Sequence, residues 1–284
     1  FFIGRVVPID PVAAIVGAKA PEDVYQRVFL ELGLDKPVIV QFGEYLWRTL
    51  NGDFGTSFVT TRPVLTDIIA FFPATLELAT IGLLLGVITG VPAGVLAAYR
   101  HDTWVDHIIR IIGLIGYSVP IFWLALVGLF VFYAKLDWVG GPGRLDIYLD
   151  GIVPPVTGLI LVDSAMAGEW DVFWNAVGHI MLPAILLGYY SLAYISRMTR
   201  SVMLEQLSQE YVLTARVKGA SEFRVVMGHA LRNAAIPLVT IVALSYGGLL
   251  EGSVLIETVF AWPGIGNYIA SSLFSADMNA VLGG

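Results

Sequence analysis

The feature that most constrains this chain is a run of consecutive residues, 111–134, without a single charged side chain. Three more stretches, 78–98, 176–196 and 233–250, also lack Asp, Glu, Lys and Arg. A helix needs about 20 mostly apolar residues to cross a bilayer. The whole chain is 57% hydrophobic and 14% charged, which is too apolar for a soluble domain. We therefore predict an all-α polytopic membrane protein with four full spans, near residues 76–99, 108–134, 176–196 and 233–251.

The charges between these stretches predict the orientation of the chain. Residues 99–110 and 197–232 together hold eight of the sixteen Lys and Arg, whereas 135–175 hold two basic residues against six acids. Lys and Arg collect on the cytoplasmic side of membrane proteins. We therefore expect 99–110 and 197–232 inside the cell, and 1–73 and 135–175 outside. This assignment alternates correctly across all four spans.

The regions outside the spans suggest how the chain is organised. Residues 1–73 read as the end of a first helix followed by an outer, periplasmic cap, with helical patterns at 22–32 and 36–50. A receptor-docking surface is the alternative for this region. Residues 135–175 form an outer loop, 197–232 a cytoplasmic loop, and 252–284 a Gly- and Pro-rich outer turn. We expect one further helix before Phe1 and another after Gly284, giving six in the intact protein.

Two spans carry residues with a structural meaning of their own. Gly82, Gly86, Gly90 and Gly94 recur every four residues, which keeps them on one side of a helix and predicts a close helix–helix contact. Pro120 predicts a kink in the second span, either purely structural or beside a translocation path. Glu77, at the outer edge of the first span, is expected either to be buried at a cost or to lie among lipid headgroups.

Several kinds of catalytic chemistry have no motif here. No Lys follows a Gly, so the chain has no P-loop for ATP, and neither H-E-x-x-H nor G-x-S-x-G occurs. The four histidines lie on different segments, and there is no cysteine to ligate a metal. We therefore predict that this chain is not itself an enzyme and holds no cofactor or metal.

The cytoplasmic loop carries the most specific motif. It contains six Lys or Arg against three acids, and it is longer than a connector needs to be. The run from Thr214 to Gly219 and the later run from His229 to Asn233 resemble the EAA loop of bacterial ATP-binding cassette (ABC) importer permeases, in the version of the peptide importers. Leu213 stands where the general consensus has Glu, a departure that the peptide branch shares. Further runs are similar to the same dipeptide and oligopeptide (DppB- and OppB-like) branch: 32–37, 52–57, 74–78, 116–123, 157–163, 182–184, 197–200 and 257–264.

The resemblance implies a fold, a place in the cell and a set of partners. The chain would be the transmembrane domain of a type I ABC importer in the bacterial inner membrane. It would translocate dipeptides or short oligopeptides. Its partners would be a second homologous permease, two ATP-binding subunits that hold ATP and Mg, a periplasmic or lipid-anchored solute-binding protein and membrane lipid, but no nucleic acid.

The resemblance also implies two groups of functional residues. A short helix near 209–220 would insert into the ATPase and end at Gly219, coupling ATP hydrolysis to the pore. The coupling group is Glu210, Thr214, Ala215, Arg216, Lys218, Gly219, Ala220, His229 and Arg232. A second group would line the translocation path or a gate: Tyr117, Ser118, Pro120, Trp123, Glu257, Trp262 and Pro263.

Three alternatives stay open at this point. The same architecture serves importers of nickel complexes, glutathione, opines and other small solutes. A secondary transporter would need ion-binding charges inside its spans, which are nearly free of charge. A membrane scaffold would explain the loop without transport.

Overall fold

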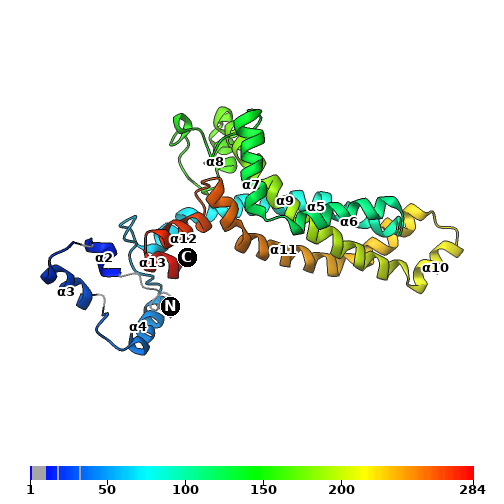
Figure 1. The fold of residues 1–284 in the computed structure, drawn as a ribbon. Coiled ribbons are helices and arrows are strands. Elements are labelled where there is room, and N and C mark those ends of the chain that lie inside the picture. The colour runs from blue at the N-terminus through cyan, green and yellow to red at the C-terminus, as the bar shows by residue number, and fades with distance from the viewer. Residues whose placement is uncertain (2–10, 18, 32) are drawn as a thin grey trace. The chain divides into compact units, whose positions relative to one another are not determined.

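The computed structural model describes residues 1, 11–17, 19–31 and 33–284, and these residues are helical apart from turns, loops and one isolated bridge between Thr56 and Pro63 (Figure 1). They divide into two compact units. The first comprises 1–73 and 263–284, and the second comprises 74–262. The boundaries fall within helix α5 and just before Pro263, and each unit has buried apolar residues of its own.

The first unit is held together by a short core and by one buried carboxylate. Its helices are α2 (Pro11–Val16), α3 (Glu22–Glu31), α4 (Val38–Leu50), the start of α5 (Val64–Tyr99), α12 (Ile265–Phe274) and α13 (Met278–Gly283). Val64, Tyr268 and Ala280 form the core. Asp277 caps α13 and accepts hydrogen bonds from the Ser57 hydroxyl at 2.6 Å and the Phe58 amide at 2.7 Å. Helices α3 and α4 agree with the helical patterns predicted at 22–32 and 36–50.

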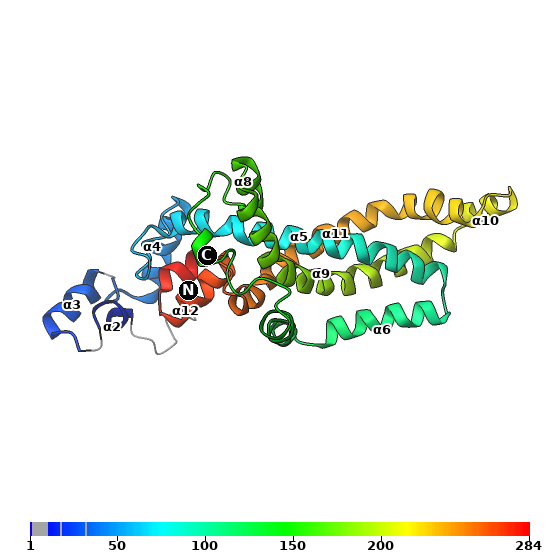
Figure 2. The same cartoon turned by 90° about the horizontal axis from the view of Figure 1, so that it is seen from above.

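The second unit contains the long apolar helices. They are α5, α6 (Trp104–Ser118), α7 (Ile121–Gly128) with η1 (Leu129–Lys135), α9 (Trp170–Leu207), and η3 (Arg224–Ala230) with α11 (Leu231–Val259). Among the residues that the structure describes, three helices are long and apolar enough to cross a membrane, or four if the bent pair of α6 and α7–η1 is one span. Both views show α5, α9 and α11 running side by side, with α10 (Glu210–Val217) at one end (Figures 1 and 2). The long apolar helices therefore follow one another in the order predicted for the spans, although they extend beyond the uncharged stretches.

The glycines spaced four apart on α5 form the predicted packing face. A Cβ atom added at Gly82, Gly86 or Gly94 would lie 2.8 Å or less from a side-chain atom of α9, and one at Gly90 would lie 3.2 Å from Ile195. The contacts advance along both helices in the same direction, from Leu187 opposite Gly82 to Thr199 opposite Gly94. Small residues thus let the two backbones approach closely.

At Pro120 the structure differs from the expected kink. Helix α6 ends at Ser118, α7 begins at Ile121, and the two are bent by 94°. Val119 is extended, with φ −87° and ψ 128°, because the ring of a following proline disfavours the helical region. One uncharged stretch therefore forms two helices joined at a sharp break.

The segment after the fourth span also differs from the expected turn. Helix α11 continues to Val259, past Gly252, and α12 and α13 follow. The chain leaves the helix at Phe260, just before the Trp262-Pro263-Gly264 run. Because 252–259 is helical, Ser253 and Glu257 lie on the same face of α11, and the Ser253 hydroxyl donates to the Glu257 carboxylate at 2.9 Å.

Two buried carboxylates organise the loop between η1 and α9, which includes η2 (Ile147–Leu149) and α8 (Ile160–Ala167). Glu77 is buried, which is the first of the two alternatives expected for it. It pairs with Arg144 at 2.5 Å and accepts a hydrogen bond from the Leu161 amide at 2.9 Å. Asp163 accepts three backbone amides and the Thr157 hydroxyl. Burial raises the pKa of Asp163, but these hydrogen bonds outweigh it and the net pKa is lowered.

Candidate functional site

Helix α10 presents most of its surface to solvent. It follows α9 after only Ser208 and Gln209, and Val212 is its one buried residue. Leu213 is 63% exposed and Val217 is 81% exposed. A short helix that keeps one buried anchor and shows apolar side chains outward is suited to insertion into a groove on another protein.

The end of α10 forms the predicted glycine stop. Gly219 has φ +82°, in the left-handed region that favours glycine. The amide of Gly219 donates to the Arg216 carbonyl at 2.9 Å, and the amide of Ala220 donates to the Ala215 carbonyl at 3.1 Å. This pair of bonds is the Schellman motif, which fixes the direction in which the chain leaves the helix.

The charged residues of the coupling group are exposed and differ in their contacts. Arg216 pairs with Glu222 across the turn, at 2.9 Å between Nε and Oε1 and 3.2 Å between Nη2 and Oε2. Lys218, His229 and Arg232 lie outside the buried core, and none of them forms an ion pair with another residue in the described part of the chain. The remaining members lie on α10 or beside it: Glu210, Thr214, Ala215 and Ala220.

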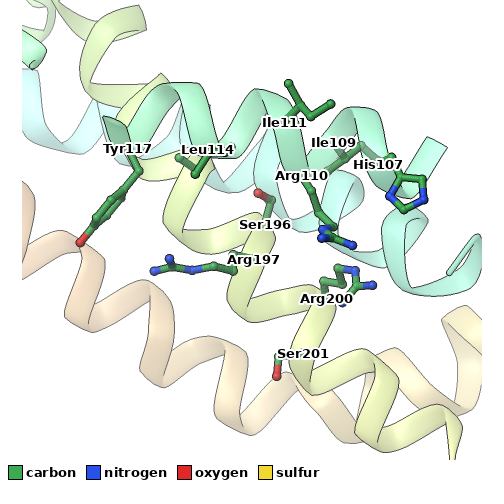
Figure 3. Close-up of a pocket in the computed structure, with 12 residues that line it drawn as sticks. His107, Ile109, Arg110, Ile111, Leu114, Tyr117, Ser196, Arg197, Arg200 and Ser201 are labelled. Atoms are coloured by element: carbon green, nitrogen blue, oxygen red, sulfur yellow. The ribbon is translucent and has the colours of Figure 1, made fainter. Parts of the chain in front are cut away.

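A cavity of about 650 Å³ lies between α6 and α9 (Figure 3). Three arginines line it: Arg110 from α6, and Arg197 and Arg200 from α9. Figure 3 shows Arg197 extending toward Tyr117, while Arg110 and Arg200 lie on the side nearer His107. The other lining residues are His107, Ile109, Ile111, Gly113, Leu114, Tyr117, Ala193, Ser196 and Ser201. We call this the arginine cavity.

One of the three arginines is neutralised inside the fold. Arg200 donates two hydrogen bonds to Asp106, of 2.6 Å from Nε and 2.7 Å from Nη2. Asp106 is fully buried and also accepts the Asp102 amide at 3.1 Å. The bidentate pair ties the start of α6 to α9 and balances one positive charge of the cavity.

A second cavity, of about 190 Å³, lies between α9 and α11 and also touches the end of α6. Tyr117 lines both cavities. Its ring stacks on Tyr190 with centroids 6.0 Å apart, and the Arg197 guanidinium lies 5.2 Å from its centroid. The buried Ser191 hydroxyl has no hydrogen-bond partner among the described residues. We call this the tyrosine cavity; its other lining residues are Tyr194, Leu244, Ser245, Gly248 and Leu249.

The residues expected along a translocation path or gate fall into exposed and buried groups in the structure. Tyr117, Ser118, Pro120 and Trp123 lie at the break between α6 and α7, and none of them is buried. Glu257 and Trp262 are buried. The Glu257 carboxylate accepts the Thr75 hydroxyl at 2.7 Å, and the Trp262 indole donates to the Ala74 carbonyl at 2.9 Å. Pro263 belongs to the other compact unit.

Sequence reasoning did not select the arginine cavity. From the sequence, Arg110, Arg197 and Arg200 count as charges that fix orientation, with 197–200 also among the runs that resemble the peptide branch, and Asp106 has no assigned role. A signal was present, because Arg197 and Arg200 are spaced i, i+3 just after an uncharged stretch and so share one helix face. That face could be assigned to a cavity only after α6 had been placed beside α9.

The structure thus combines long apolar helices, an exposed short helix and a cavity lined by arginines. Residues 90–284 match the family of binding-protein-dependent transport system inner membrane components, and residues 1–79 match the N-terminal part of such membrane components. The chain belongs to this family. It is an inner-membrane permease component, and membership implies a binding protein and an ATPase as partners in general.

Several relatives align along the whole chain. It is 44% identical to the probable D,D-dipeptide transport system permease protein DdpB of Escherichia coli K12, over 100% of this chain and 83% of the relative. It is 42% identical to the di/tripeptide transport system permease protein DppB of Pseudomonas aeruginosa, covering 84% of that protein. Identity to the dipeptide transport system permease protein DppB of Escherichia coli K12 is 41%, again with 84% covered.

Proposed function

We propose that this chain is the permease subunit of an ABC importer that moves dipeptides or short oligopeptides into the cell. The observation that carries this proposal is its full-length similarity to three permeases whose names specify dipeptide, di/tripeptide and D,D-dipeptide transport. The complex would contain a second homologous permease, two ATP-binding subunits and a periplasmic or lipid-anchored solute-binding protein.

Coupling to ATP hydrolysis would pass through α10. Its exposed Leu213 and Val217 supply an apolar surface for a groove on the ATPase, and Lys218 supplies an exposed charge for its rim. The Schellman end at Gly219 and the Arg216–Glu222 pair support this role, because they fix the shape of the turn that follows. His229 and Arg232, farther along the loop, would contact the same partner.

Cargo would pass the break between α6 and α7. Tyr117 lines both cavities beside that break, and backbone groups freed at a broken helix are tolerated where they line a cavity. Tyr117, Ser118, Pro120 and Trp123 would therefore contact the path. Glu257, Trp262 and Pro263 would belong to an outer gate whose packing changes during the transport cycle.

The test is to purify the complete importer with residues 209–220 present or deleted, and to measure ATP hydrolysis and peptide uptake in vesicles. We expect binding protein loaded with dipeptide to stimulate hydrolysis and uptake only when α10 is present. No ATPase on the intact permease would refute the ABC assignment. Hydrolysis stimulated by another solute, and not by any di- or tripeptide, would refute the cargo.

A further inference from the structure

We propose that the arginine cavity binds an oxyanion, namely the free carboxylate of the cargo peptide on its way to the cytoplasm, at the Arg197 guanidinium, with Arg110 adding positive charge on the side nearer His107. This inference rests on the proposed function and adds a recognition site to it. The permease itself would then select for a free carboxyl end, in addition to any selection by the binding protein.

The charge balance of the cavity leaves two positive charges for a ligand. Arg200 is paired with the buried carboxylate of Asp106 through two hydrogen bonds. Neither Arg197 nor Arg110 forms a salt bridge within the part of the chain that the structure describes, although Arg110 is also attracted to Asp106. His107, the other titratable side chain on the α6 wall besides Tyr117, adds no negative charge. A guanidinium binds a carboxylate in a bidentate, charge-assisted manner.

The shape and lining of the cavity suit a small peptide. Ligand sites typically measure about 300 to 1,000 Å³, and this cavity of about 650 Å³ falls within that range. Leu114 and Ile111 offer apolar surface, while Ser196 and Ser201 offer hydroxyl groups. Tyr117 also lines the tyrosine cavity, where the Ser191 hydroxyl, which has no hydrogen-bond partner among the described residues, is a further free polar group.

The Asp106–Arg200 pair leaves the Arg197 guanidinium available to a ligand. Because Asp106 uses its carboxylate on Arg200, it does not neutralise the ends of Arg197, which lies one helical turn earlier on α9. The Arg197 guanidinium instead lies over the rings of Tyr117 and Tyr194, at 5.2 and 5.9 Å. Cation–π contacts hold its plane in place and leave its hydrogen-bond donors for an oxyanion.

The experiment uses the complete importer in vesicles, free of nucleotide, with probes added at the cytoplasmic face and no binding protein present. One probe is a dipeptide with a photoreactive side chain and a free carboxylate; the matched probe ends in an amide. We expect the carboxylate probe to label peptides from residues 107–117 or 193–201 about tenfold more than the amide probe, the factor that one charge-assisted bond supplies.

Variants assign the effect to the two arginines. Arg197→Gln with Arg110→Gln should remove the difference between the probes, and Arg197→Lys should retain part of it. The control is Arg224→Gln, which removes an exposed cytoplasmic charge on η3 outside the cavity. Equal labelling by the two probes in the unchanged protein overturns the proposal, whether or not the double variant assembles.

Two further arms separate the alternatives. Vesicles with and without phosphatidylglycerol test a lipid headgroup as the source of the oxyanion. If this lipid abolishes probe labelling and is itself lost from the double variant, the cavity is a lipid site and the proposal is wrong. Uptake driven by binding protein is measured in the same vesicles. Normal uptake with equal labelling refutes only this inference, whereas absent uptake of every peptide refutes the proposed function.

Discussion

The absence of a Cβ atom at Gly94 allows α5 and α9 to pack closely. The Cβ added at Gly94 would lie 2.5 Å from the Thr199 Cβ and 2.6 Å from the Ser196 carbonyl oxygen. A backbone oxygen cannot move aside as a flexible side chain can. The glycine is therefore required by the neighbouring helix, since its own backbone is ordinary helix.

Gly94→Val is expected to separate the two helices and destabilise the domain by about 1 to 3 kcal/mol or more, the cost of overpacking a tight interface. The measurement is the thermal unfolding midpoint of the purified protein in detergent. Gly252→Val is the matched control, because a Cβ at Gly252 meets nothing within 4 Å. Equal midpoints for the two variants would contradict the packing argument.

A buried tyrosine should make the first unit sensitive to alkali. Burial raises the pKa of Tyr268 to about 12, with a further contribution from the Asp67 charge. The folded chain then holds the phenol proton more tightly than the unfolded chain. Its stabilising contribution is complete below pH 10 and is lost as the pH rises to about 12.

The expected loss is about 3 kcal/mol of unfolding free energy between those pH values. Denaturant unfolding of the whole chain, followed by hydrogen exchange at α12, would measure it. Tyr268→Phe should flatten the pH dependence in this range. A slope that survives in Tyr268→Phe would show that another group is responsible.

At the scale of elements, α10 depends on how it ends. A Cβ atom added at Gly219 would meet nothing within 4 Å, so substitution there is restricted by backbone conformation and by what approaches from outside. A non-glycine residue in this left-handed conformation costs about 1 to 2 kcal/mol.

Gly219→Trp is therefore expected to leave membrane insertion and ATP hydrolysis intact while lowering uptake by roughly tenfold, the effect of about 1.4 kcal/mol at one contact. Hydrolysis and uptake are measured together in vesicles. Gly219→Asn is the control, because asparagine tolerates the left-handed conformation. Full uptake by the Trp variant would disprove the coupling role of this turn.

The tie between α6 and α9 makes a separate prediction. Asp106→Ala leaves the partly buried Arg200 without its partner and should cost about 3 to 5 kcal/mol. Thermal unfolding and the exchange of α6 amides would report the loss. Asp102→Asn removes the charge of a neighbouring, exposed carboxylate, keeps a side chain that tolerates the left-handed backbone of this residue (φ 57°), and should change little.

At the scale of the whole molecule, most of the fold followed from apolar stretches and their spacing. Uncharged length predicted the order of the membrane helices, and the glycine interval predicted the face of α5 that packs. The 94° break at Pro120 could not be predicted from that residue alone, because many helices with proline only bend.

The site was only partly predictable for a related reason. The end of α10 is local, and the resemblance of this loop to a known motif was enough to place it at Gly219. The arginine cavity is not local: it depends on Arg110 and Arg197, far apart in the chain, facing the same space. Likewise, the partners of Glu257 on α5 and α11 became known only with the fold.

Transport itself provides the test of Glu257. Its buried carboxylate joins Thr75 of α5 to Ser253 of α11. Glu257→Ala leaves the Thr75 and Ser253 hydroxyls without this acceptor, which destabilises the conformation described here by about 1 to 3 kcal/mol. The uptake rate should then change by about tenfold. Glu257→Gln keeps an acceptor oxygen and is the control. Unchanged uptake in the Ala variant would refute a gating role.

The length of α9 has a mechanical consequence. Thirty-eight residues make a rod of about 57 Å, nearly twice the roughly 30 Å of bilayer hydrocarbon. Only Ser208 and Gln209 separate this rod from α10. A tilt of about 10° around the middle of such a rod displaces each tip by about 5 Å, or nearly one helical turn. A small tilt of α9 therefore moves its ends, and α10 beside one of them, far enough to exchange one set of side-chain contacts for another.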